Sequence, residues 1–146
     1  MLSASEMVLL WLVTQAAATD LALRKIPNVL VAAGLLLALV LRCLAEPEWS
    51  VALDWAGGSV AGLLVFLPLY LLRGMAAGDV KLMAMVGAFL GPAAALVTAM
   101  LAALCGGVLA MLWLSYGHAA EQERSGMPYG VAIAFGTMAW LVWQQR

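Results

Sequence analysis

Two aspartates lie at the borders of long apolar stretches. Asp20 ends the first apolar stretch, and Asp79 follows a run of small residues between two later ones. A charged side chain at bilayer depth costs on the order of a few kcal/mol, so acids in such places are functional candidates. Two carboxylates within hydrogen-bonding distance cannot both ionise cheaply and therefore share a proton. Such a pair can hydrolyse a peptide bond: the ionised carboxylate takes a proton from water while the protonated one donates to the scissile carbonyl oxygen.

Each aspartate also has a simpler interpretation. Asp79 could cap the N-terminus of an apolar helix by accepting backbone N–H groups. Asp20 could be an interfacial acid paired with Arg24, one helical turn away. Lys81 is most simply an anchor whose ammonium group reaches the polar interface. Five further acids lie in polar surroundings, where solubility explains them: Glu46, Glu48, Asp54, Glu121 and Glu123.

Cysteine and histidine chemistry is not expected. Cys43 and Cys105 are far apart, each in an apolar stretch, with no C-x-x-C pair. His118 is the only histidine, which excludes a histidine-based metal site. We therefore expect no cofactor and no metal, and we interpret the cysteines as small apolar side chains.

The composition identifies the elements that must position the aspartates. Of the 146 residues, 66% are hydrophobic and 10% are charged, whereas soluble domains have roughly 45–50% and about 25%. This excludes a soluble enzyme, a secreted disulfide scaffold, a disordered chain and a nucleic-acid-binding protein. We predict an all-α, polytopic membrane helix bundle that forms one domain over residues 1–146.

The division into spans follows charges, prolines and glycines. A membrane-crossing helix needs about 20 mostly apolar residues, and Gly91-Pro92 marks the end of one helix and the start of the next. About six transmembrane helices result, near residues 1–19, 27–44, 55–72, 80–91, 92–115 and 128–143. The fourth is short for a full crossing. Polar loops are predicted over residues 45–54 and 116–127.

The basic residues predict the orientation of the bundle. Lys and Arg accumulate on the cytoplasmic side. Six crossings place Arg24, Lys25, Arg73, Lys81 and Arg124 on one side, and Arg42 and Arg146 on the other. Both termini are therefore expected outside, with both aspartates at the cytoplasmic border.

The N-terminal stretch also imitates a secretory signal. Its apolar residues are followed by Ala16–Ala18, as at a cleavage site, but the segment before them carries Glu6 and no Lys or Arg. We expect it to remain as the first span.

Three segments resemble one family in the expected order. Residues 20–28 resemble the D-x5-I-P-N motif of type IV prepilin peptidases, ending in Pro27 and Asn28. Residues 78–82, with Gly78, Asp79 and Lys81, resemble their G-x-G-D-x-K-L motif. Residues 127–134 resemble the closing segment of the same family.

This resemblance implies a GxGD-type membrane aspartic protease with Asp20 and Asp79 as catalytic residues. It implies a multi-pass protein of the bacterial inner membrane, with the active site toward the cytoplasm. It also implies cleavage of the short basic leader of prepilins or pseudopilins, just before their hydrophobic helix. The chain resembles the short form associated with tight-adherence (Flp) pili, which lacks the cysteine-rich methyltransferase domain. Expected partners are these precursors and membrane lipids, with no nucleic acid.

The first glycine of G-x-G-D is Ala76 in this sequence. If the family needs an unusual backbone angle there, alanine disfavours it; if it needs only a small side chain, alanine serves, which is our expectation. Two alternatives remain: a proton-coupled carrier using the acids as ion ligands, and a non-catalytic assembly scaffold. Against the carrier, the acids lie at span ends and no internal repeat is visible. Glu121 and Glu123 are candidates for attracting the basic leader, on charge sign alone.

Overall fold

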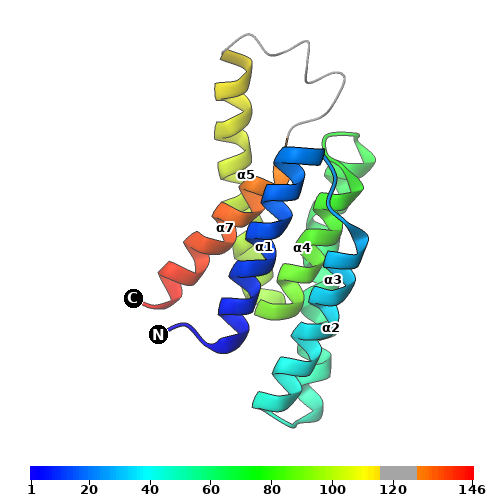
Figure 1. Ribbon diagram of the computed structural model, residues 1–146, viewed down its shortest axis with the longest axis vertical. Coiled ribbons are helices and arrows are strands. Elements are labelled where there is room, and N and C mark those ends of the chain that lie inside the picture. Colours follow the sequence, from blue (N-terminus) through cyan, green and yellow to red (C-terminus); the bar gives the residue numbers. More distant parts are fainter. Residues whose placement is uncertain (116–127) are drawn as a thin grey trace.

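The computed structural model describes residues 1–115 and 128–146, which form six helices and no strand (Figure 1). The predicted loop over residues 116–127, with His118, Glu121, Glu123 and Arg124, lies outside the described residues. In chain order the helices are α1 (Ala4–Leu23), α2 (Asn28–Ala45), α3 (Trp49–Leu71), α4 (Ala77–Leu90), α5 (Pro92–Ser115) and α7 (Tyr129–Gln144). The predicted all-α class is confirmed.

Among residues 1–115 and 128–146, four helices are long and apolar enough to cross a membrane: α1, α2, α3 and residues 92–112 of α5. This identifies a polytopic membrane protein. Helices α4 and α7 have 14 and 16 residues, fewer than the roughly 17–25 that a crossing helix usually needs. The bundle therefore combines four candidate spans with two shorter helices.

Three predicted boundaries move. The fourth helix was predicted from residue 80, but α4 begins at Ala77, so Asp79 lies inside it. The predicted polar loop over residues 45–54 was too long, because α3 already begins at Trp49, directly after Pro47 and Glu48. Asp54 therefore lies on a helix; its side chain is 60% exposed and pairs with Arg42 at 3.5 Å. A polar residue on an exposed helix face does not end the helix, so Asp54 is no reason to place the start of α3 after it. The first helix likewise extends beyond residue 19, so that Asp20 lies in its last turn.

Helix α4 is the centre of the bundle (Figure 1). Its residues from Asp79 to Phe89 are all buried except Lys81, and it contacts every other helix in the described residues. Its closest neighbour is α3: a Cβ at Gly58 would meet the backbone carbonyl of Gly87, and one at Gly62 would meet that of Met83. Small residues at such contacts let membrane helices approach closely.

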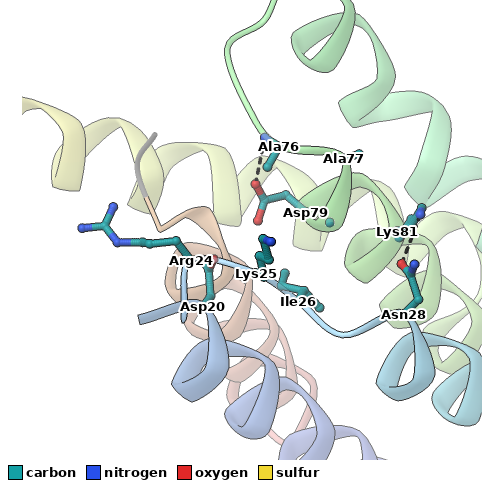
Figure 2. Close-up of a pocket in the computed structure, with 10 residues that line it drawn as sticks. Asp20, Arg24, Lys25, Ile26, Asn28, Ala76, Ala77, Asp79 and Lys81 are labelled. Atoms are coloured by element: carbon teal, nitrogen blue, oxygen red, sulfur yellow. Dashed lines mark hydrogen bonds between the residues drawn. The ribbon is translucent and has the colours of Figure 1, made fainter. Parts of the chain in front are cut away.

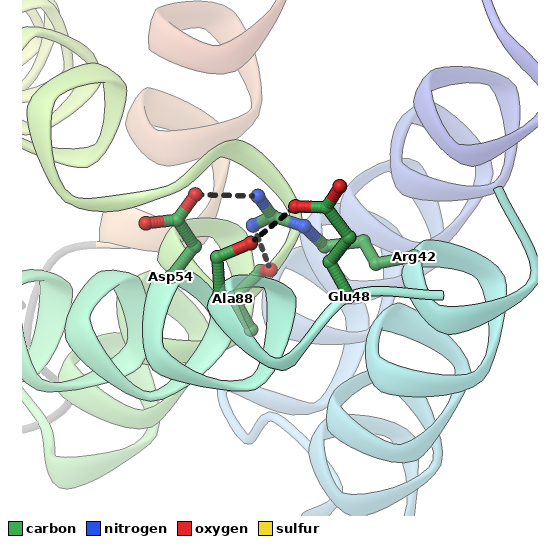
Figure 3. Close-up of polar contacts among 5 residues, drawn as sticks. Arg42, Glu48, Asp54 and Ala88 are labelled. Atoms are coloured by element: carbon green, nitrogen blue, oxygen red, sulfur yellow. Dashed lines mark hydrogen bonds and ion pairs between the residues drawn. The ribbon is translucent and has the colours of Figure 1, made fainter. Parts of the chain in front are cut away.

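Arg42 binds the C-terminal end of α4. Arg42 on α2 donates to the backbone carbonyl of Ala88 at 3.2 Å and also pairs with Asp54 on α3 (Figure 3). The last carbonyls of a helix have no partner within the helix, so Arg42 satisfies one of them and joins three helices. Helix α4 ends just beyond, at Gly91, whose φ of 86° suits glycine.

The chain direction brings the two aspartates to one end of the bundle. The N- and C-termini lie together at the opposite end from the C-terminus of α1 and the turn between α3 and α4 (Figure 1). Asp20 is in the last turn of α1 and Asp79 is in the first turn of α4. Antiparallel packing therefore places these two turns at the same level.

Candidate active site

Asp20 is held at the junction of α1 and α7. Its side chain is buried, with 7% of the residue exposed, and its Oδ2 accepts the backbone N–H of Gly130 at 2.9 Å. Helix α1 ends one turn later at Arg24, which has the left-handed φ of 53°. This turn directs the chain away from α1 and into the segment that leads to α2.

Asp79 is the third residue of α4 and is more deeply buried, with 2% exposed. Its Oδ2 accepts the backbone N–H of Ala76, the residue that caps α4, at 3.2 Å. The capping interpretation is thus correct in part: Asp79 does bind an N-terminal donor of the helix, but from within the first turn and not from the cap position.

Both aspartates line one pocket of about 220 Å³ (Figure 2). Around them the pocket is lined by Arg24, Lys25, Ile26, Asn28, Ala76, Ala77, Gly78 and Lys81. Asp79 lies on α4, which is not among the candidate spans. Burial raises the pKa of Asp79 to about 7, with a further increase from the charge of Asp20 and an opposing effect of the Ala76 hydrogen bond. The charge of Asp20 therefore acts on Asp79 across the pocket.

The motif residues around the aspartates contact each other across the pocket. A Cβ at Gly78 would lie 3.3 Å from Cβ of Ile26, so the small residue lets the two segments approach. Lys81 Nζ donates to Asn28 Oδ1 at 3.1 Å, joining α4 to the start of α2 (Figure 2). Pro27 is the N-cap of α2 and fixes where that helix begins. The structure thus brings together residues 20–28 and 78–82, the two segments that carry the motifs.

The backbone at Ala76 accepts alanine without strain. Its φ and ψ are −80° and 154°, an extended conformation open to any L-residue, and the residue is exposed. Neither the backbone angle nor the surrounding space requires glycine here. The geometry favours the interpretation that this position needs only a small side chain, which alanine provides.

Gly130 is the part of the site that sequence reasoning missed. It belongs to the closing segment, which was matched as a motif but given no role. The motif itself was the only signal in the sequence, because every residue except proline has a backbone N–H and residue type therefore does not reveal its role.

The described residues offer no metal site: no group of three His, Cys, Asp or Glu side chains suited to a metal lies among residues 1–115 and 128–146.

Comparison with known proteins gives one match. The model of the type IV leader peptidase family matches residues 7–111, a range that contains both aspartates and the segments around them. A search of curated proteins and a search of solved structures each return no match. The family match covers well over half of the chain. The chain belongs to the type IV leader peptidase family and is a protease of that kind.

Proposed function

We propose that the chain removes the basic leader peptide from type IV prepilins or pseudopilins, with Asp20 and Asp79 as the catalytic pair. The observation that carries this proposal is the placement of two buried aspartates, one on α1 and one on α4, in one pocket at the end of the bundle. Flp-type precursors are the expected substrates, on the resemblance to the short form of the family. The sequence has two cysteines and no C-x-x-C pair, which supports a peptidase without N-methyltransferase activity.

The pair acts through one shared proton. The ionised carboxylate takes a proton from water, the water oxygen bonds to the scissile carbonyl carbon, and the other carboxyl protonates the carbonyl oxygen. The resulting gem-diol collapses as the C–N bond breaks. The leaving nitrogen takes the proton from the first carboxyl, and one diol hydroxyl returns a proton to the second. Both aspartates regain their starting states.

The charge distribution supports an active site facing the cytoplasm at the bacterial inner membrane. Arg24, Lys25 and Lys81 line the aspartate pocket, and Arg73 lies in the nearby turn between α3 and α4. Arg42 lies at the opposite end, near the C-terminus of α4. Basic residues concentrate on the cytoplasmic side of membrane proteins.

An apolar groove beside the pocket suits the segment that follows the scissile bond. It has a volume of about 260 Å³ and is lined by Asn28, Val31, Ala32, Leu35, Leu63, Lys81 and Ala84. Asn28 and Lys81 also line the aspartate pocket, so the groove and the pocket are neighbours that share these two residues. A substrate bound across both would have its scissile bond at the aspartates and its apolar helix along α2, α3 and α4. Glu121 and Glu123, our candidates for contacting the leader, lie outside the described residues.

Replacing each aspartate by asparagine tests the catalytic pair. Asn keeps the size of the side chain but cannot carry the shared proton. We expect Asp20→Asn and Asp79→Asn each to lower the cleavage rate of a purified precursor by roughly 10²–10⁴-fold. Cleavage is followed by the mobility shift of the precursor on a gel.

The third aspartate of the chain provides the control. Asp54 lies on α3 away from the pocket, with its side chain 60% exposed, and Asp54→Asn should cleave at close to the wild-type rate. Wild-type cleavage by either of the other two variants would refute the proposed pair. Equal losses in all three would show that asparagine acts through the fold and not through the chemistry.

A further inference from the structure

The first turn of α7 is part of the site, although it lies outside residues 7–111. Gly130 is the second residue of α7, and N–H groups in the first turn of a helix have no partner within the helix. The N-cap residue Pro128 provides no side-chain hydrogen bond. The carboxylate of Asp20 accepts the Gly130 N–H at 2.9 Å instead. A side chain from α1 therefore does for α7 what a capping residue would do.

Only glycine lets this contact form as it stands. A Cβ at position 130 would lie 2.8 Å from Oδ2, 3.1 Å from Cβ and 3.2 Å from Cγ of Asp20. The first of these distances is shorter than side-chain packing allows. An alanine methyl group would push the carboxylate of Asp20 away from the N–H group and change its direction toward Asp79.

The two carboxyl groups have different surroundings. Asp20 is less buried than Asp79 and accepts the shorter hydrogen bond, 2.9 Å against 3.2 Å. Each carboxyl accepts one N–H group at a helix N-terminus, which favours a carboxylate, so the difference lies in the shorter bond to Asp20 and in the deeper burial of Asp79, which favours a protonated carboxyl group. Besides Asp20, four residues with ionisable side chains line the pocket. They are Arg24 at the C-cap of α1, Lys25 of the connection to α2, and Asp79 and Lys81 of α4.

We propose that Asp20, held by the N–H of Gly130 at the start of α7, is the carboxylate that takes the proton from water, while Asp79 donates its proton to the scissile carbonyl oxygen. Gly130 is then a positioning residue for the base. This assignment rests on the proposed function and gives each aspartate one role in the steps described above. It also gives α7 a part in catalysis.

Alanine at position 130 tests the positioning role. We expect Gly130→Ala to lower kcat for precursor cleavage at least about tenfold, with KM within about twofold. The ionised base loses its hydrogen bond, so the acid limb of the pH–rate profile should move up by about one pH unit. The alkaline limb, which reports the proton on Asp79, should stay where it is in the wild type.

Gly107 provides the matched control. It lies on α5, and a Cβ there meets nothing within 4 Å, so Gly107→Ala should leave kcat and both limbs unchanged. A Gly130→Ala enzyme with the wild-type profile would overturn the positioning role. A fall in kcat with no movement of the acid limb would overturn it as well, because a purely structural defect behaves in that way.

A titration by infrared spectroscopy tests the assignment without changing Gly130. In Asp79→Asn the remaining carboxyl of the pair is Asp20, and in Asp20→Asn it is Asp79; subtracting the spectrum of the double variant isolates each. We expect the carboxyl band of Asp20 to disappear at a lower pH than that of Asp79. The reverse order, or equal midpoints, would refute the assignment. Cleavage by these variants is measured separately, so failure of the proposed function is seen independently.

Discussion

The backbone at Ala76 decides whether this chain can work without the first glycine of the G-x-G-D motif. A glycine is indispensable where φ is positive or where another atom occupies the space of a Cβ. At Ala76 φ is −80° and the residue is exposed, so neither condition holds. Its backbone N–H, which Asp79 accepts, is present in either residue. The departure therefore gives no reason to regard the chain as a non-catalytic scaffold.

The corresponding prediction concerns Ala76→Gly. We expect the rate of precursor cleavage to stay within about twofold of wild type, because only an exposed methyl group is lost. The greater freedom of glycine in the unfolded chain costs stability by roughly 0.5–1 kcal/mol, as at other ordered positions. Rate and thermal unfolding in detergent are measured on the same preparation. A large gain in activity on restoring glycine would show that alanine impairs the site in a way that the backbone angles do not reveal.

At the residue scale, side-chain chemistry could be predicted from sequence and backbone chemistry could not. Asp20 and Asp79 stand out because a carboxyl group among apolar residues is costly and needs a reason. Gly130 acts through a backbone N–H that every residue except proline has, and only the packing of α7 against α1 shows that the space for its side chain is taken. The contact between Ile26 and Gly78 could not be predicted either, because it depends on how the segment before α2 packs against the first turn of α4.

At the element scale, helix lengths depend on burial as well as on hydropathy. Helix α4 has 14 residues and can lie at the centre of the bundle because it packs against α1, α2, α3, α5 and α7, and because Arg42 satisfies a carbonyl near its C-terminus. The sequence predicted a short fourth helix from Gly91-Pro92, and the structure confirms it. The start of α3 was predicted too late, because Asp54 was taken as part of a loop although its partner on α2 lets it lie on a helix face.

Close packing of α3 against α4 makes a prediction at this scale. A Cβ at Gly58 would meet the carbonyl group of Gly87, whereas the nearest atom to one at Gly57 is Pro92 Cγ at 3.8 Å. We expect Gly58→Ala to destabilise the fold by about 1–3 kcal/mol, since a backbone carbonyl cannot move aside without separating the helices. Gly57→Ala should be neutral or slightly stabilising, because alanine is the better helix former.

Unfolding in detergent, followed by tryptophan fluorescence, compares these two neighbouring positions. Similar stability of the two alanine variants would show that α3 and α4 are not packed as closely as described here. Cleavage rates add a second comparison: separating α3 from α4 also disturbs the helix that carries Asp79, so Gly58→Ala should lose activity as well as stability.

At the scale of the whole molecule, the candidate site forms where four elements meet at one end of the bundle. Helix α1 brings Asp20, α4 brings Asp79, α2 brings Asn28 to Lys81, and α7 brings its first turn. The sequence predicted that the aspartates would lie on one side, from the distribution of basic residues. It could not predict the apolar groove beside the pocket, because Val31, Leu35, Leu63 and Ala84 meet only in the folded protein.

The groove provides a test of substrate placement. Ala32 lines it, whereas its neighbour Ala33 is exposed on α2 and lines neither the groove nor the aspartate pocket. We expect Ala32→Trp to raise KM at least about tenfold for a precursor that retains its apolar helix, because the indole fills the space which that helix would occupy; loss of apolar contact worth about 1.4 kcal/mol corresponds to such a change. Ala33→Trp should leave KM unchanged.

A second substrate separates binding from chemistry. A peptide with the leader and only a few residues beyond the scissile bond has no helix to place in the groove, so the wild type and Ala32→Trp should cleave it equally well. If Ala32→Trp slowed both substrates alike, the tryptophan would be distorting the aspartate pocket. If it slowed neither, the apolar helix would lie along another face of the bundle, and the groove would be an ordinary lipid-facing surface. Only a defect confined to the long substrate supports one continuous binding path from the aspartates into the membrane.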